Sequence, residues 1–335
     1  MTVQTIGDLA QSFFLLQRSN RLKTDQFRLT QELATGQVAD VKSVLAGNFS
    51  YLSELESDMK TLDAYRIATT EATQFTGAMQ QALDRVETSN RDLVHAMLVV
   101  GSNTVDAVVS TVATDAEANL AQIVTSLNTS LAGRSLFSGT ATNVSPLSST
   151  DDILNGLRAA LVGQTSVDDI LTTARNWFDD PAGFEATVYR GESTDLPPFR
   201  LSRDTSVSLP IKATDPALRE VMMHSALAAL VTDPTLGLDN AGQRALLLEA
   251  GEGLLVGNDG VIALRGNIGF AEARIEDTSA RNAAELTSLQ FARNAFLEAD
   301  PYETATKLED VQFQLQSLYS ITVRMSELSL GNYLR

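Results

Sequence analysis

Residues 308–329 read LEDVQFQLQSLYSITVRMSELS, and the spacing of their apolar positions decides the fold. Steps of three and four residues, taken in alternation, run through Leu308, Val311, Leu315, Leu318, Thr322, Met325 and Ser329. Positions at these steps share one stripe of an α-helix, which is the pattern of a helix that packs along another helix. We therefore expect the last part of the chain to form a long helix with a packed seam.

The first part of the chain predicts a second long helix. Its apolar positions form two rows, one through Ile6, Leu9, Phe13 and Leu16 and the other through Leu15, Leu22 and Leu29. Two apolar rows on one helix predict two buried faces. Gly36 marks the end of this helix, because glycine is common just past a helix C-terminus. Since helices occupy both ends and flank a less helical middle, we predict that the two ends pair.

The middle of the chain predicts further helices and a small insert. Helical periodicity over 45–135 favours two or three long antiparallel helices, with a turn at 101–103. Short β-branched or aromatic segments at 184–189, 199–202 and 206–211 predict two to four antiparallel strands.

Helical character returns at 216–231 and again from about 241 to the end, interrupted at 251–260 and at 300–301. The expected fold is mainly α. It consists of long antiparallel helices and a small α+β insert. The N-terminal and C-terminal helices pair as a coiled coil.

Composition excludes several classes of function. The 335 residues carry a net charge of −17 and show no cluster of Lys and Arg, which disfavours nucleic acid and anionic membranes as partners. There is no cysteine, and therefore no disulfide or thiol chemistry. We find no apolar run of the roughly 20 residues that span a bilayer, and no Sec-type signal at the N-terminus. Composition alone therefore predicts a cytoplasmic protein.

No residue pattern indicates catalysis. The Asp pairs at 151–152, 168–169 and 179–180 adjoin Ser, Thr, Val or Pro and are interpreted as helix caps and turns rather than metal ligands. His95 and His224 lack a second ligand at metal-binding spacing, so we expect ordinary helix positions. The glycine-rich run 251–260 lacks the spacing of a dinucleotide loop and predicts a turn. Trp177 is expected to anchor the core of the insert. We predict no catalytic, cofactor-binding or metal-binding residue.

Several segments carry a family resemblance. At the C-terminus these are Asp300-Pro-Tyr-Glu-Thr-Ala305 and the ending Ser329-Leu-Gly-Asn-Tyr-Leu334. Earlier segments are Glu32-Leu-Ala-Thr-Gly36, Gly133-Arg-Ser-Leu-Phe-Ser-Gly139, Tyr189-Arg-Gly-Glu192, Arg265-Gly-Asn-Ile-Gly269 and Arg274-Ile-Glu276. Their order and spacing resemble the bacterial flagellin and hook-associated protein family over roughly both terminal thirds. One departure is Gln37-Val-Ala-Asp-Val-Lys-Ser43, where the family usually has an Asp-rich stretch.

The resemblance implies a structural subunit of the bacterial flagellum that joins the hook to the filament and needs no cofactor. It also implies secretion through the flagellar type III channel and a location at the hook–filament junction, which replaces the cytoplasmic prediction. The implied partners are further copies of the chain, a neighbouring hook-associated protein, flagellin and an export chaperone, but neither nucleic acid nor membrane.

The resemblance also implies a division of the chain. Residues 1–40 and 295–335 are expected to form an inner coiled-coil layer, 41–135 and 235–294 an outer helical bundle, and 136–234 a distal insert. Subunits would pack laterally through the inner helices. The expected packing residues are Leu9, Phe13, Leu16, Leu22, Leu308, Val311, Leu315, Leu318, Met325 and Leu328.

Three alternatives remain open at the level of sequence. The chain could be a flagellin that forms the filament itself, because a flagellin would share the terminal features. It could instead be a flagellin-like protein that carries an adhesin or an enzyme in residues 140–234. The third alternative is a soluble coiled-coil scaffold with no link to the flagellum.

Overall fold

The computed structural model describes residues 3–41, 49–100 and 106–333, and the side chains of these residues except 3–9 and 326–333. These residues form two compact units, Met1–Asp63 with Ala284–Arg335, called here the terminal unit, and Ala64–Ala283, called here the bundle unit. The turn predicted at 101–103 lies outside the described residues.

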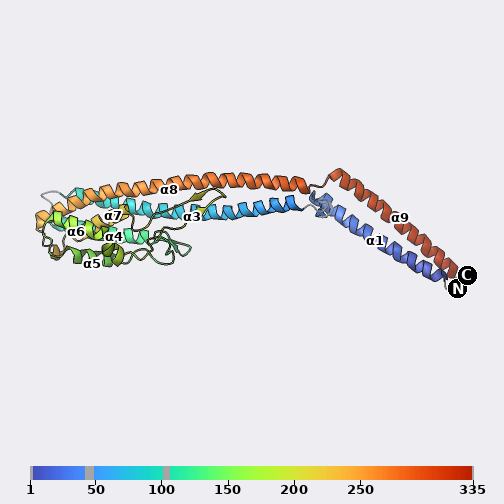
Figure 1. Ribbon diagram of the computed structural model, residues 1–335, viewed down its shortest axis with the longest axis horizontal. Helices are drawn as coiled ribbons and strands as arrows, with labels where there is room; N and C mark the ends of the chain where they lie inside the picture. Colours follow the sequence, from blue (N-terminus) through green and yellow to red (C-terminus); the bar gives the residue numbers. More distant parts are fainter. Residues whose placement is uncertain (1–2, 42–48, 101–105, 334–335) are drawn as a thin grey trace. The chain divides into compact units, whose positions relative to one another are not determined.

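Helices dominate both units (Figure 1), which confirms the predicted fold class. In chain order the elements are α1 (Val3–Thr35), α3 (Ser50–Leu98), α4 (Asp106–Leu127), β1 (Ser130–Leu131), β2 (Arg134–Ser135), α5 (Thr150–Leu161), α6 (Val167–Asp179), η1 (Pro181–Glu185), β3 (Phe199–Arg200), β4 (Ser206–Val207), α7 (Pro216–Ala229), η2 (Pro234–Leu236), α8 (Asn240–Leu297) and α9 (Pro301–Tyr333). Among the described residues the sheets are two antiparallel pairs, β1 with β2 and β3 with β4.

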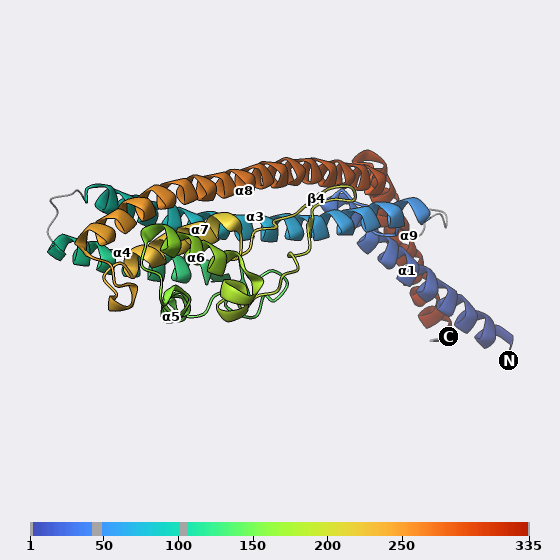
Figure 2. The same ribbon diagram turned by 60° about the vertical axis from the view of Figure 1, so that its left-hand side comes forward.

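The terminal unit is built around α1 and α9, which lie side by side in both views (Figures 1 and 2). Helix α1 ends where Gly36 adopts φ +68°, a left-handed conformation that glycine reaches without strain. Helix α9 starts at Pro301, which follows Asp300. The Asp300 Oδ1 accepts hydrogen bonds from the amides of Tyr302 at 2.8 Å and Glu303 at 3.1 Å. Both predicted boundaries are therefore confirmed, and a capped start and a glycine stop define the pair.

The bundle unit is organised around α7, which is buried on nearly every side. Its buried residues are Leu218, Val221, Met222, Met223, His224, Ser225, Ala226, Leu227 and Ala228. A helix that is apolar all round belongs in a core, and α7 packs against α4 and contacts α8 through the glycines described below. Helices α3 and α8 run side by side, while α5 lies on the far side of α7 from α8 (Figures 1 and 2).

The glycine-rich run 251–260 is helical, so the predicted turn is wrong. It lies within α8, and its glycines are contact positions. A Cβ on Gly253 would lie 2.1 Å from the ring of His224, one on Gly257 2.9 Å from Val221, and one on Gly260 2.8 Å from Ala217. These glycines let the backbones of α7 and α8 approach closely. Their spacing of four and three residues places them on one face of α8.

A buried polar network crosses the bundle. The Asn119 Nδ2 on α4 donates to the Ser89 Oγ at 2.7 Å and the Asn90 Oδ1 at 3.2 Å on α3. The Ser225 Oγ on α7 donates to the Asn119 Oδ1 at 2.7 Å, and the Asn90 Nδ2 reaches the Asn258 Oδ1 on α8 at 3.5 Å. Buried polar groups are costly unless they are paired. This network therefore favours the register in which the four helices bring these residues together.

The insert contains fewer strand residues than predicted. Residues 199–200 and 206–207 form β3 and β4 as expected. The predicted strand at 184–189 is wrong, because Phe184 belongs to η1 and only Tyr189 makes a single bridge, to Leu147. Phe184 is fully buried and its ring stacks on Phe178 with the centroids 5.0 Å apart. Burial of this aromatic side chain in a helical turn overrides its β-propensity.

Trp177 anchors this region as predicted. It makes edge-to-face contacts with Phe178 at 4.9 Å and with Phe184 at 6.0 Å between ring centroids. Its indole ring also covers Gly156, where a Cβ would lie 2.6 Å from the ring. The lone tryptophan therefore joins α5, α6 and η1.

The Asp pairs serve helix ends, which confirms their interpretation as caps and turns. Ser149 is the N-cap of α5 and forms a capping box with Asp152, and its hydrogen bonds hold the pKa of the Asp152 carboxyl below its ordinary value. Ser166 caps α6 in front of Asp168 and Asp169. The Asp180 Oδ1 accepts the Ala182 amide at 2.9 Å. No group of three or more His, Asp or Glu side chains in the described ranges could hold a metal ion.

The two histidines lie on helices as expected. His95 is exposed on α3, whereas His224 on α7 is almost fully buried. The His224 Nε2 lies 3.1 Å from the Glu220 Oε1, and this hydrogen bond is the main cause of a lowered pKa of the Glu220 carboxyl. The ring of His224 faces Gly253, so its position reflects packing between α7 and α8.

Candidate assembly surface on the terminal helices

The seam between α1 and α9 uses only one of the two apolar rows of α1. Leu22 on α1 packs with Leu315 and Leu318 on α9, and all three are buried. Leu15 and Val311 extend this contact and are partly buried. The row of α1 that is seven residues apart therefore faces α9. Apolar side chains at this spacing form one continuous seam along a helix pair.

The described residues of the other row of α1, Phe13 and Leu16, are mostly exposed. The side chains of Phe13 and Leu16 are 71% and 61% exposed, in contrast to 7% for Leu22. Among the further exposed apolar residues on the pair are Phe14 and Phe27 on α1 and Phe313, Tyr319, Ile321 and Val323 on α9. We call these eight residues the terminal apolar surface. Single exposed apolar residues are normal on a protein surface, whereas groups of them mark sites of interaction.

Two grooves run along the helix pair and share no residue. One has a volume of about 550 Å³ and is lined by Phe14, Arg18, Arg21 and Val311, among others. The other has a volume of about 460 Å³ and lies beside Leu16, Lys23, Tyr319 and Met325. The Lys23 Nζ lies 5.9 Å from the centroid of the Tyr319 ring, a cation–π contact across the pair. Each groove combines apolar walls with basic side chains.

A short joint closes the helix pair at one end. Gln37 and Glu298 form an antiparallel bridge. On either side of the bridge, the Val38 amide donates to the Leu297 carbonyl at 2.9 Å and the Ala299 amide to the Gly36 carbonyl at 3.0 Å. The chain thus leaves α1 and enters α9 at the same level, held by backbone hydrogen bonds. Buried below are Leu52 and Leu297, with Val41 and Phe296 against them.

The ten residues expected from the sequence fall into four groups. Leu22, Leu315 and Leu318 are buried in the seam, and Leu308, Val311 and Met325 are partly buried. Phe13 and Leu16 are exposed on the terminal apolar surface. Leu9 and Leu328 lie outside the residues whose side chains are described. Packing of these residues between subunits stays a prediction.

Several residues of the terminal apolar surface were not expected from the sequence. Phe14, Phe27, Phe313, Ile321 and Val323 lie off the rows that define the seam. A search for one packed stripe passes over such positions. The usable signal is the number of large apolar residues outside the seam, because a two-helix contact has no place for them.

The architecture defines a class of helical proteins in which the two chain ends pair and the middle of the chain forms a separate helical unit. Within this class, the chain is similar to the structure of a protein provisionally assigned as a flagellar hook-associated protein from Vibrio parahaemolyticus. That structure shares 14% sequence identity at a TM-score of 0.51, with 75% of this chain and 99% of that chain covered. The predicted resemblance to flagellar hook-associated proteins is thereby confirmed at the level of the fold.

A second similar structure is FlgL from Bacillus cereus, with 15% identity, a TM-score of 0.41, and coverage of 71% of this chain and 94% of that chain. No family profile matches the sequence, and no curated protein matches it significantly. None of the helices in the described ranges is both long enough and apolar enough to cross a membrane.

Proposed function

We propose that this chain is a structural subunit of the bacterial flagellum, with no catalytic activity, that joins the hook to the filament. The observation that carries the proposal is the terminal apolar surface. Phe13 and Leu16 belong to a regular helical row, yet both side chains are mostly exposed. A row of this kind is stabilised when a neighbouring subunit packs against it, and burial of one large apolar side chain contributes about 1.5 to 3 kcal/mol.

The likeness in fold to flagellar hook-associated proteins supports the same proposal. In the assembly that we propose, 1–40 and 295–335 form the inner layer, 41–135 and 235–294 the outer helical layer, and 136–234 the distal part. The partners are further copies of the chain, a neighbouring hook-associated protein and flagellin. The subunit reaches its place through the flagellar type III channel with the help of an export chaperone.

The first test replaces exposed residues that the isolated chain does not need. We expect the double variant Phe13→Ser, Leu16→Ser to keep the helix content of the parent, because both side chains are exposed. In a deletion strain this variant should leave hooks without filaments and release unpolymerised flagellin into the medium. The measurements are electron microscopy of the flagella and the amount of flagellin in the supernatant.

The matched control is Phe270→Ser, which removes a side chain that is 78% exposed on α8 in the bundle unit. It should support filaments as the parent does. Filaments of normal number and length on cells with the double variant would contradict packing through the terminal apolar surface.

Localisation separates the junction role from the flagellin alternative. Under the proposal, gold-labelled antibody should mark a short band at the distal end of the hook. Labelling along the whole filament would instead identify the chain as a filament subunit. Absence of the protein from purified hooks and filaments would favour a scaffold with no link to the flagellum.

A further inference from the structure

The chain after α1 contains three backbone amides that no helix can satisfy. Beyond Gly36 the amides of Gln37, Val38 and Ala39 find their acceptors outside the helical pattern. The Gln37 amide donates to the Thr35 Oγ1 at 3.3 Å, and the Val38 amide to the Leu297 carbonyl at 2.9 Å. The third, the Ala39 amide, donates to a side chain, the Glu32 Oε1, at 3.1 Å.

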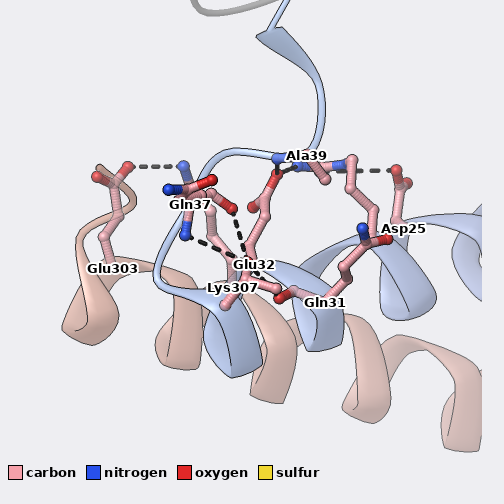
Figure 3. Close-up of polar contacts among 9 residues, drawn as sticks. Asp25, Gln31, Glu32, Gln37, Ala39, Glu303 and Lys307 are labelled. Atoms are coloured by element: carbon pink, nitrogen blue, oxygen red, sulfur yellow. Dashed lines mark hydrogen bonds and ion pairs between the residues drawn. The ribbon is translucent and has the colours of Figure 1, made fainter. Parts of the chain in front are cut away.

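The Glu32 carboxylate is positioned by a second hydrogen bond and by burial. It is only 5% exposed, and the same Oε1 that faces Ala39 in Figure 3 accepts a hydrogen bond from the Arg28 Nη1 at 2.9 Å. Arg28 in turn lies 3.8 Å from the Asp25 Oδ1. A buried carboxylate requires compensation by a cation and by hydrogen bonds, and Glu32 has both. Its oxygen thus ties the last turn of α1 to Ala39, four residues beyond the helix end.

We propose that Glu32 is the latch of a two-stranded joint that couples the exit from α1 to the entry into α9. Ala39 lies next to Val38, whose amide is bonded to Leu297, and the Ala299 amide is bonded to Gly36. Release of the Ala39 amide frees the segment that forms one strand of this bridge. The opposite strand, 297–299, then loses its partner. A change in the path of the chain at the end of α1 is therefore accompanied by a change at the start of α9.

Glu303 provides the contrast within the same unit. It pairs with Lys307 at 2.6 Å four residues along α9, which matches the spacing of Glu32 from Arg28 (Figure 3). The side chains of Glu303 and Lys307 are both more than half exposed, and no backbone amide of a neighbouring segment is bonded to the Glu303 carboxylate among the described residues. A surface pair of this kind contributes little to stability. Glu32→Ala and Glu303→Ala thus each remove an ion pair between residues four apart on a helix. Only Glu32→Ala also removes the hydrogen bond to the Ala39 amide.

The test is amide hydrogen exchange of the purified, unassembled full-length chain. In Glu32→Ala the amides of Val38, Ala39 and Ala299 should exchange together, on the order of 10- to 100-fold faster than in the parent, the range expected for loss of a charge-assisted hydrogen bond. Glu32→Gln keeps an acceptor oxygen and should give an intermediate increase. Glu303→Ala should leave these three amides unchanged.

Unchanged exchange at Ala39 in Glu32→Ala would overturn the latch. Faster exchange at Ala39 alone, with Ala299 unchanged, would overturn the coupling of the two strands. If Glu32→Ala and Glu303→Ala changed the exchange of these amides equally, Glu32 would contribute no more than an ordinary surface ion pair. Amides of α4 and α7 report whether the variants remain folded. Because the readout needs no assembly, the outcome is independent of the proposed flagellar role.

Discussion

In the bundle unit, several glycines stabilise a helix contact although glycine is a poor helix former. Glycine usually weakens a helix, yet Gly253, Gly257 and Gly260 lie within α8 at its contact with α7. The absence of a side chain is what the contact requires. The same glycine type at Gly266 faces open space, where a Cβ would meet nothing within 4 Å. The two sites therefore respond oppositely to the same substitution.

We expect Gly253→Ala to lower the free energy of unfolding of the bundle unit by about 1 to 3 kcal/mol. The added Cβ would lie 2.1 Å from the ring of His224, which is buried and has little room to move. Gly266→Ala is the matched control and should raise stability by up to about 1 kcal/mol, because alanine favours helix. Urea denaturation monitored by circular dichroism measures both. A stabilising Gly253→Ala would refute the close contact.

At the scale of the element, α1 and α9 form a pair with a narrow seam and a wide uncovered surface. The seam residues Leu22, Leu315 and Leu318 are buried, whereas Phe313, two residues from Leu315, is 70% exposed. Neighbouring apolar positions on one helix thus have different tasks. The buried residues hold the pair together in the isolated chain. Under the proposed function, the exposed residues pack against a neighbouring subunit.

We expect Leu315→Ala to weaken the helix pair by about 2 kcal/mol or more, since it removes a buried side chain and leaves a cavity. Phe313→Ala, the control, should leave the isolated pair nearly unchanged. Amide exchange of α1 measures the effect, because protection of α1 depends on its contact with α9. If the two variants exposed α1 equally, the assignment of Leu315 to the seam and Phe313 to the surface would be wrong.

At the scale of the whole molecule, the two units differ in the extent of their cores. The buried cluster between α1 and α9 consists of Leu22, Leu315 and Leu318, whereas the core of the bundle unit draws on α3, α4, α5, α6, α7 and α8. Local stability follows the amount of buried apolar contact. The terminal helices should therefore be the less stable part of the chain.

We expect the isolated protein to lose helix in two steps on heating. Exchange protection of α1 and α9 should disappear in the first step, and that of α4 and α7 only in the second. Circular dichroism and hydrogen exchange over the same temperature range provide the measurement. Coincident loss of protection in all four helices would show that the chain unfolds as one cooperative unit.

Helix periodicity carried most of the fold prediction, because it is a local property. The seven-residue rows of α1 and α9 could be found in the sequence since side chains that share a helix face recur at fixed steps. Gly36 could be interpreted as a helix stop, and Asp300-Pro301 as an interruption of the helix, because glycine and proline preferences act within a few residues. Pairing of the two ends followed from the layout of helices around a less helical middle.

Contacts that do not follow from helix periodicity could not be found in this way. Gly253 and His224 are 29 positions apart, and only the packing of α7 on α8 shows that the glycine makes room for the ring. Glu32 offered a motif of resemblance but no hint that its carboxylate accepts the Ala39 amide, because a charged residue near a helix end is usually solvated. The Gln37–Ala39 stretch, atypical in sequence, proved to be one strand of the joint.

The sequence by itself determined that this is a chain of long helices with paired ends, because hydrophobic periodicity and capping are local and survive in a list of residues. Only the tertiary structure decided which of the two apolar rows of α1 faces α9, why α8 continues through a run of glycines, and where the carboxylate of Glu32 points. The first two depend on what a second segment, remote in the chain, places opposite the first, and the third depends on the path of the chain just beyond Gly36. These features are set by tertiary packing and not by hydrophobic periodicity.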